Sequence, residues 1–376
     1  ARNPRDAEAY LERSRAYIQI GGYGRAITDC NMVLRLDPNL WQVYGSLGSC
    51  FKSMGLFQDA IETYDRGLKV NPKWVEAYFP RGNCKFMMKD YGGALHDYNM
   101  ALTAPGLSAQ AKQDIYVNRG SAMGATGNYQ GLIESLNRAA KYGESTRLML
   151  TNQALAYSHL GKNKEAESKF LLAIAKDPKR AQSYIDLAVF YSLNKTAEKQ
   201  NLKEAIVQLD KALVIEPGNS KALAAKIKIL QKQSNYKEAI NLITTYLTTY
   251  GDELEMQLLK IKLLAQDKQL KEATRLAEFI TQKTPDNSDA WFELGNCYFD
   301  DGRFADASAA FDKTATITPK DTTALSNAAI CQRKLGDFDK ALQFLAQARQ
   351  GKADKDLDDD MLLQEAITLL HTTRLN

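Results

Sequence analysis

The sequence lacks any apolar run of about 18 residues, the length that a helix needs to span a bilayer. Its first residues also lack the charged, then apolar, then small-residue order of a signal peptide. Charge of one sign is not in large excess either, because 49 Lys and Arg stand against 45 Asp and Glu, for a net charge of +4. We therefore predict no membrane insertion by this chain and no nucleic-acid partner.

Groups that carry chemistry are also scarce. The five Cys form no CxxC spacing and no disulfide framework, and the three His (His96, His159 and His371) lie far apart. No phosphate loop ending in Lys-Ser/Thr, no Gly-x-Ser-x-Gly and no His-Glu-x-x-His occurs. The sequence therefore predicts that the chain is not an enzyme and holds no cofactor or metal.

What the sequence does contain is a long internal period. The segments WQVYGSLGSCFKSMGLFQDAIETYDRGLKVNPK, from Trp41, and DAWFELGNCYFDDGRFADASAAFDKTATITPKD, from Asp289, share one frame of aromatic, Gly, Ala and Pro positions. That frame recurs from residues 7, 41, 75, 113, 147, 181, 220, 254, 288 and 322, with steps of 34, 34, 38, 34, 34, 39, 34, 34 and 34 residues. We interpret the two longer steps as insertions in connections, near residues 106–112 and 194–201.

Within one unit the pattern predicts two helices. Large apolar residues such as Trp291, Leu294 and Tyr298 fall on one stripe of a first helix, Gly302 turns the chain, and Pro319 ends the second helix. A small residue, Gly or Ala, recurs at one position of the first helix in units two to six, nine and ten. Because Gly inside a helix lowers the stability of that helix, its recurrence indicates a close contact with another helix. These residues are Gly48, Gly82, Gly120, Ala154, Ala188, Gly295 and Ala329.

The period, the two-helix pattern and the recurring small residues resemble the tetratricopeptide repeat family over nearly the full length of the chain. The resemblance implies an all-α fold, a right-handed α-solenoid of about ten helical hairpins over residues 7–355. We expect residues 1–6 to end a preceding repeat or linker and residues 356–376 to form a C-terminal capping helix. The natural protein is then expected to continue upstream of residue 1.

Four cysteines, Cys50, Cys84, Cys297 and Cys331, share one position two residues after the small residue. We interpret them, together with Cys30, as small buried side chains that stay unpaired thiols. Unpaired thiols favour a reducing, cytoplasmic compartment, and a secreted or periplasmic location is left open.

Repeat arrays bind partners on the exposed faces of their first helices, so that the frame also predicts a groove. Units three to six contribute an apolar floor with few charges, which favours a bound protein or peptide segment, although several of these residues could instead pack on the neighbouring unit. The predicted groove residues are Phe79, Asn83, Phe86, Met87, Val117, Asn118, Asn152, Leu155, His159, Ile185, Val189 and Leu193.

Flanking units have charged first helices. The seventh carries a basic stretch, and the ninth carries acidic and aromatic residues. A solvated helix face explains both about as well as a binding role does. The residues are Lys221, Lys226, Lys228 and Lys232 in the seventh unit, and Asp289, Phe292, Asn296, Phe299 and Asp300 in the ninth.

The resemblance also allows a sharper test of partner type. Chaperone-binding members of the family hold a C-terminal carboxylate with a set of Lys, Asn and Arg on three repeats. The corresponding positions here hold Leu11, Arg15, Ser46, Glu76 and Pro80, which disfavours a heat-shock co-chaperone. Members that bind extended chains use a ladder of Asn, and here only Asn118, Asn152 and Asn327 supply it among ten units.

The sequence thus predicts an interaction scaffold that holds a partner peptide or segment in a groove. A second hypothesis is a recruiting or regulatory arm of a larger enzyme or of a secretion or assembly machine whose other domain lies upstream. A third is a homodimer formed through the terminal hairpins.

Overall fold

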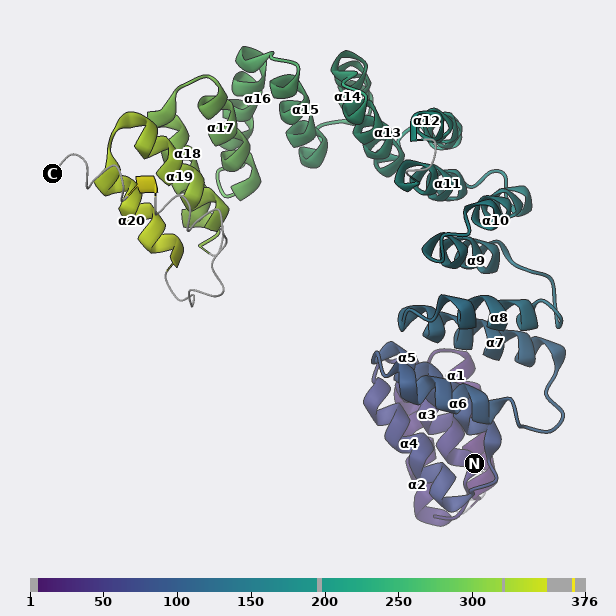
Figure 1. Ribbon diagram of the computed structural model, residues 1–376. Coiled ribbons are helices and arrows are strands. Elements are labelled where there is room, and N and C mark those ends of the chain that lie inside the picture. The colour runs from purple at the N-terminus through teal and green to yellow at the C-terminus, as the bar shows by residue number, and fades with distance from the viewer. Residues whose placement is uncertain (1–5, 195–197, 320–321, 350–366, 369–376) are drawn as a thin grey trace. The chain divides into compact units, whose positions relative to one another are not determined.

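The computed structural model describes residues 6–194, 198–319, 322–349 and 367–368 (Figure 1). The chain divides into two compact units, Ala1–Phe190 and Tyr191–Asn376, and each is described by itself. The described residues form 20 α-helices and one short 3-10 helix, with no β-strand among them. The predicted all-α fold is therefore confirmed.

The first unit is a stack of helical hairpins (Figure 1). Its last helix, α11, ends with three residues that belong to the second unit. The elements are α1 (Ala7–Gln19), α2 (Tyr23–Leu36), α3 (Gln42–Ser53), α4 (Phe57–Val70), η1 (Val75–Ala77), α5 (Tyr78–Met87), α6 (Tyr91–Ala101), α7 (Ala109–Ala125), α8 (Tyr129–Ala139), α9 (Arg147–His159), α10 (Asn163–Lys176) and α11 (Ala181–Leu193).

The second unit repeats the same arrangement of paired helices. Its elements are α12 (Glu198–Ile215), α13 (Ser220–Lys232), α14 (Tyr236–Tyr250), α15 (Leu254–Gln266), α16 (Leu270–Lys283), α17 (Ser288–Asp300), α18 (Phe304–Ile317), α19 (Thr322–Leu335) and α20 (Phe338–Arg349). The predicted preceding segment and capping helix lie outside the described residues, except for Asp6 and residues 367–368.

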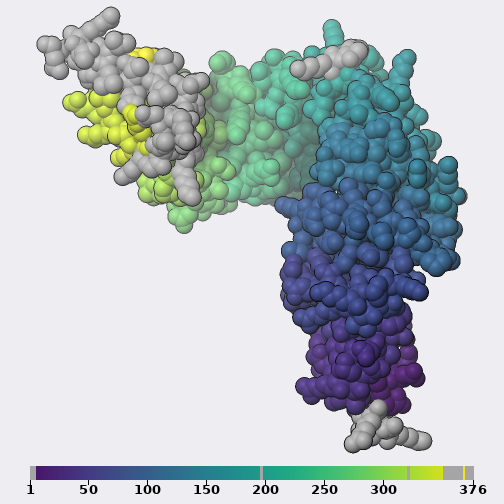
Figure 2. Space-filling view, turned by 60° about the horizontal axis from the view of Figure 1, so that its bottom comes forward, coloured from purple at the N-terminus to yellow at the C-terminus, as the bar shows by residue number. Residues whose placement is uncertain are grey.

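Odd-numbered helices are the first helices of the hairpins, and even-numbered helices are the second helices. Within each unit a second helix typically packs both on its own first helix and on the first helix that follows it, as α4 does on α3 and α5 and as α16 does on α15 and α17. Successive first helices also touch one another, as α5 touches α7 and α15 touches α17, more extensively than successive second helices do. The row of first helices is therefore the inner side of each stack. In Figure 2 the helices of the first unit, coloured purple to blue, form a continuously packed body.

Three of the small residues of the first helices, Gly48, Gly82 and Gly295, lie where an aromatic ring of the second helix crosses. A Cβ atom added to Gly48 would lie 2.7 Å from the Tyr64 ring, and one added to Gly295 would lie 2.7 Å from the Phe311 ring. Both rings are 1% exposed. The close helix contact that the sequence indicated is therefore present, and it explains why Gly is kept within a helix.

In every hairpin whose turn the structure fully describes, the turn between the two helices has one left-handed residue. Glycine takes it at positive φ in most hairpins, as Gly55 (77°) and Gly302 (76°) do. Lys89, Ser234 and Lys268 occupy the corresponding place with φ of 65°, 57° and 65°. Glycine adopts this left-handed conformation without steric cost. At the three other positions, the packing of the two helices holds a residue with a side chain in the same conformation.

The predicted insertion near residues 106–112 lengthens a helix and not only the connection. The helix α7 begins at Ala109, where the Ser108 side chain accepts a hydrogen bond from the Ala111 N–H and so caps the first turn. The helix α12 likewise begins at Glu198, inside the predicted connection 194–201. The expectation of a loop was therefore wrong for the first insertion, whose extra residues extend α7, and at the second insertion the described residues 198–201 are helical.

Candidate functional site

The predicted groove of the first unit contains three apolar side chains with large exposed fractions. Met87 on α5 is 58% exposed, Leu155 on α9 is 45% exposed and Val189 on α11 is 42% exposed. His159, at the end of α9, is also exposed. These side chains leave apolar surface on the first helices, the kind of surface that partners cover.

Two predicted groove aromatics are only partly available. Phe79 and Phe86 are half-buried, and each ring packs on an aromatic ring of its own hairpin. The Phe79 ring lies 6.1 Å from the Tyr98 ring, and the Phe86 ring lies 5.4 Å from the Tyr91 ring, edge to face. They stabilise the hairpin α5–α6 as well as lining the first-helix face.

Polar groove residues connect neighbouring hairpins. The Asn83 side-chain oxygen accepts hydrogen bonds from the Asn118 amide at 3.0 Å and from the Tyr98 hydroxyl at 2.9 Å. The His159 ring stacks on the Tyr129 ring of the preceding hairpin, with 4.2 Å between centroids. The structure thus brings Asn83 and Asn118 together between α5 and α7.

Four further groove predictions have different outcomes. Ile185 is 6% exposed and packs inside the first unit, so its placement on the groove floor was wrong. Leu193 is 72% exposed but belongs to the second unit. Val117 and Asn152 are half-buried on α7 and α9. The groove as predicted therefore includes at least one side chain that a partner does not reach.

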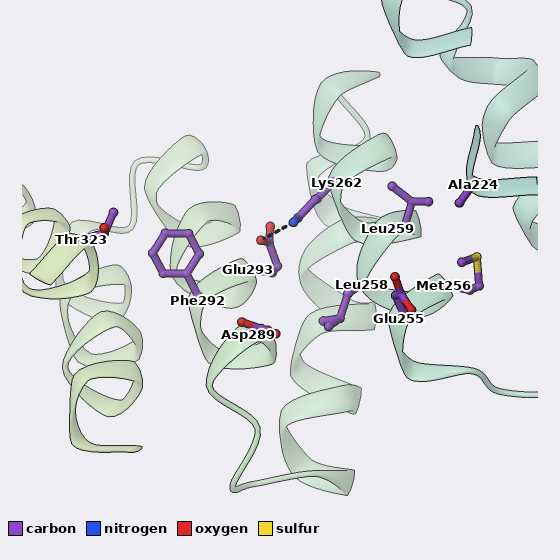
Figure 3. Close-up of a pocket in the computed structure, with 10 residues that line it drawn as sticks. All are labelled: Ala224, Glu255, Met256, Leu258, Leu259, Lys262, Asp289, Phe292, Glu293 and Thr323. Carbon is purple, nitrogen blue, oxygen red and sulfur yellow. Dashed lines mark ion pairs between the residues drawn. The ribbon is translucent and has the colours of Figure 1, made fainter. Parts of the chain in front are cut away.

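The second unit has a pocket that the predicted groove does not include (Figure 3). It lies on the first helices α13, α15, α17 and α19 and has a volume of about 500 Å³. Figure 3 shows side chains of α15 and α17 directed into the space between these two helices. The lining residues are Ala224, Glu255, Met256, Leu258, Leu259, Lys262, Asp289, Phe292, Glu293 and Thr323.

Three carboxylates and one ammonium group line this pocket. The Lys262 Nζ lies 3.2 Å from the Glu293 Oε1, and the dashed line in Figure 3 marks this ion pair. Glu293 is 8% exposed, whereas Glu255 and Asp289 are exposed and form no ion pair with another described residue. The pocket therefore carries an excess of negative charge beside apolar side chains.

The frame contained a signal for this pocket. Glu255 and Asp289 occupy the same position of their repeats, one residue after the start, and Leu258 and Phe292 occupy another shared position. Asp289 and Phe292 were among the predicted charged-face residues, but a solvated face explained them equally well. In the basic stretch of the seventh unit, Lys226 is 9% exposed and its Nζ lies 2.7 Å from Asp210, so that it is a packing residue.

Further polar side chains connect helices at one repeated position of the first helix. Arg81 on α5 binds Asp97 of its own hairpin at 2.6 Å and also contacts Asp65 of the preceding hairpin. Asp97 is completely buried and also lies 3.0 Å from the Lys85 Nζ. Arg13 with Asp29 repeats the same spacing of 16 residues. These pairs hold hairpins together, and sequence reasoning missed them.

The five cysteines are buried free thiols, as predicted. Burial raises the pKa of the Cys50 and Cys84 thiols to about 11 and the pKa of the Cys297 and Cys331 thiols to about 12. No group of His, Cys, Asp and Glu within the described ranges is arranged to hold a metal ion. Among the helices that the structure describes, none is both long and apolar enough to cross a membrane.

Comparison with known proteins gives one consistent family. Models of the tetratricopeptide repeat match residues 42–73, 264–328 and 299–359. The chain is 34% identical over 70 residues to small glutamine-rich tetratricopeptide repeat-containing protein 2 of Mycosarcoma maydis. This alignment covers 19% of this chain and 20% of that protein. The chain is also 35% identical over 72 residues to Hsp70-Hsp90 organizing protein 3 of Arabidopsis thaliana. This alignment covers 19% of this chain and 13% of that protein.

Each alignment thus spans a fifth or less of the relative's own length. Among solved structures, a tetratricopeptide repeat protein from Parabacteroides merdae is 18% identical, with 68% of this chain and 98% of that chain covered and a TM-score of 0.49. The 34-residue period, the paired helices and the matches to the family models agree. The chain thus contains tetratricopeptide repeats, which the family models match at residues 42–73, 264–328 and 299–359.

Proposed function

We propose that this chain is an interaction scaffold that holds a segment of a partner protein on the inner side of its helical stacks. Repeat arrays of this kind use the extended face of their first helices for binding. In the first unit the exposed apolar side chains Met87, Leu155 and Val189 support the proposal, because they lie on the first helices α5, α9 and α11. A segment that covers them removes apolar surface from water.

The surroundings of these residues favour an extended or helical segment and not a small molecule. The hydrogen bond from the Asn118 amide to Asn83 links α5 with α7, so that the face continues from one hairpin to the next. Half-buried Phe79 and Phe86 add apolar surface on the same hairpin as Met87. The apolar contacts would supply affinity, and the amide side chains would fix the register of the bound segment.

The proposed partner is not a C-terminal carboxylate of the kind that chaperone-binding relatives hold. The positions that would carry the Lys, Asn and Arg of such a site hold Leu11, Arg15, Ser46, Glu76 and Pro80. Leu11 is 5% exposed and packs in the core, and the Arg15 guanidinium pairs with Glu12 of its own helix. Among the five residues at these positions, Arg15 is therefore the single cation.

A peptide selection tests the proposal. A display library of random 15-residue peptides is selected on the intact chain, and enriched peptides are measured by fluorescence anisotropy. We expect the triple variant Met87→Gln, Leu155→Gln, Val189→Thr to weaken binding of peptides that occupy the first unit by about tenfold or more, since several apolar contacts are lost. These side chains are exposed, so that the substitutions are expected to leave the helices folded.

The matched control changes apolar residues of similar exposure on second helices. Leu171 and Leu172 on α10 are 49% and 48% exposed, and Val70 on α4 is 38% exposed. The variant Leu171→Gln, Leu172→Gln, Val70→Thr is expected to bind the same peptides with unchanged affinity. Equal loss in both triple variants, or loss only in the control, would place the binding surface elsewhere and refute the proposal.

A further inference from the structure

The pocket of the second unit has a different chemistry from the inner face of the first unit. Its floor is apolar, with Leu258 on α15 and Phe292 on α17 half-buried on facing helices. Its volume of about 500 Å³ falls within the range of pockets that hold ligands. It therefore has room for one or two long side chains.

The charges of the pocket are not balanced within the described part of the chain. Lys262 contributes one positive charge and is paired with Glu293, which leaves the carboxylates of Glu255 and Asp289 without an ion pair there. The Glu293 carboxylate is nine-tenths buried and is paired with Lys262, so that the exposed carboxylates of Glu255 and Asp289 carry the net negative charge of the pocket. The side chains do not converge into a group that could hold a metal ion. A cationic side chain of a partner would complement the pocket.

We propose that this pocket selects partner segments that carry an arginine next to an apolar residue. The proposal deepens the scaffold function proposed above and rests on it. The aliphatic stem of an arginine packs on apolar surface such as Phe292 and Leu258, while its guanidinium presents a planar fork of donors to carboxylates such as Asp289 and Glu255. The guanidinium is also more weakly hydrated than an ammonium group and stacks on aromatic faces, which favours arginine over lysine here.

The same selection of random peptides tests this proposal separately from the scaffold function. Peptides selected on the intact chain are sequenced, and the frequency of arginine is compared with that obtained on the double variant Glu255→Gln, Asp289→Asn. We expect arginine to be enriched on the intact chain and to lose its enrichment on this variant. Peptides enriched without arginine would overturn the pocket proposal alone, and no enriched peptide at all would overturn the scaffold function with it.

Affinity measurements sharpen the test. An enriched arginine peptide is compared with the same peptide in which citrulline, a neutral isostere, or lysine replaces the arginine. We expect citrulline to weaken binding about tenfold and lysine to weaken it less. The double variant Glu255→Gln, Asp289→Asn should bind the arginine peptide about as weakly as the intact chain binds the citrulline peptide. Equal affinity for the three peptides would contradict the proposal.

Two further variants separate a local effect from a change in net charge. The control Glu272→Gln, Asp312→Asn removes two exposed carboxylates from the second helices α16 and α18 and is expected to leave binding unchanged. Lys262→Met removes the cation that competes for Glu293, so that the arginine peptide should bind several-fold more tightly. Equal losses in the control and in the pocket variant would show a nonspecific charge effect and overturn the proposal.

Another occupant of the pocket is a second copy of this chain. Light scattering of the intact chain over a range of concentrations is expected to give the mass of one chain. A dimer that dissociates in Glu255→Gln, Asp289→Asn would show that a second copy fills the pocket, and it would overturn the choice of an arginine-bearing partner.

Discussion

The inner faces of the two units differ although both units are built on one period. In the first unit the exposed groove residues Met87, Leu155 and Val189 are apolar. In the second unit the corresponding helices present Glu255 and Asp289 beside Phe292. The repeat thus fixes the helices and their packing, while the exposed positions of the first helices are free to acquire different binding chemistry in different parts of the chain.

The buried positions of the two units show the opposite behaviour. Gly82 faces Tyr98 in the first unit as Gly295 faces Phe311 in the second, at the same two places of the repeat. A polar pair spaced by 16 residues occurs as Arg81 with Asp97 in the first unit and, between adjacent hairpins, as Lys226 with Asp210 in the second. Because the carboxylates of these two pairs differ in burial, substitutions of Asp97 and Asp210 compare what a buried and a half-exposed pair contribute to stability.

The largest expected effect is that of removing the buried carboxylate of the first unit. Asp97 is completely buried between Arg81 and Lys85, whereas the Asp210 side chain is 51% exposed. We expect Asp97→Ala to lower the free energy of unfolding by about 3–5 kcal/mol, because Lys85 loses this ion pair and Arg81 keeps only its contact with Asp65. Asp210→Ala is expected to lower it by about 1 kcal/mol, because solvent already screens the half-exposed Asp210 carboxylate in its pair with Lys226. Native-state hydrogen exchange of α5–α6 and α12–α13 measures both losses. Equal losses would show that burial does not govern these pairs.

The second prediction compares glycines at one position of the repeat. A Cβ atom on Gly295 would lie 2.7 Å from the Phe311 ring, whereas one on Gly120 would lie 3.4 Å from Leu136, an ordinary contact. We expect Gly295→Ala to destabilise the second unit by about 1–3 kcal/mol through overpacking. Gly120→Ala in the first unit is expected to be neutral, or stabilising by up to about 1 kcal/mol from helix propensity.

Urea denaturation followed by circular dichroism measures both glycine variants. A second variant, Gly295→Ala with Phe311→Leu, should recover part of the lost stability, because the smaller side chain makes room for the new methyl group. If Gly295→Ala is as stable as the unmodified chain, the close contact between α17 and α18 does not require glycine.

The smallest expected effect concerns the buried thiols at alkaline pH. Burial raises the pKa of Cys297 and Cys331 from 9.0 to about 12, so that an unfolded thiol loses its proton at a lower pH than a folded one. Their contribution to stability is therefore complete below about pH 9 and is lost as the pH rises toward 12. At pH 10 we expect a loss of roughly 1 kcal/mol for each thiol, relative to pH 8.

The variant Cys297→Ala, Cys331→Ala isolates this effect from the titration of tyrosines and lysines. Its urea midpoint should fall less between pH 8 and pH 10 than the midpoint of the unmodified chain. Cys50→Ala, Cys84→Ala gives the corresponding measurement for the first unit, where burial raises the pKa values to about 11. Identical pH profiles with and without the thiols would contradict the expected coupling.

Much of the fold could be predicted because buried positions repeat. The places of Gly48, Gly82 and Gly295 in the sequence indicated close helix contacts, and each of these glycines faces an aromatic ring. The start of α7 at Ala109 could not be predicted from the period, because an insertion can lengthen either a loop or a helix, and the capping hydrogen bond of Ser108 decided the outcome.

The candidate site was less predictable for a different reason. The exposed fraction of a side chain depends on how closely the neighbouring helices approach, and the repeat pattern of the sequence does not give this distance. Ile185 and Val189 are one helical turn apart on α11, yet one is 6% and the other 42% exposed. The pocket of the second unit likewise depends on the separation of α15 and α17, so that Lys262 and Glu293 became interpretable only when their contact was known.

Both proposed binding sites require that the first helices, and not the second helices, bind the partner. Hydrogen–deuterium exchange of the intact chain with and without a saturating selected peptide tests this claim directly. We expect protection on first helices, α5, α7 and α9 for peptides bound to the first unit or α15 and α17 for arginine peptides, with α10, α14 and α16 unchanged. Protection confined to α10, α14 or α16 would contradict it.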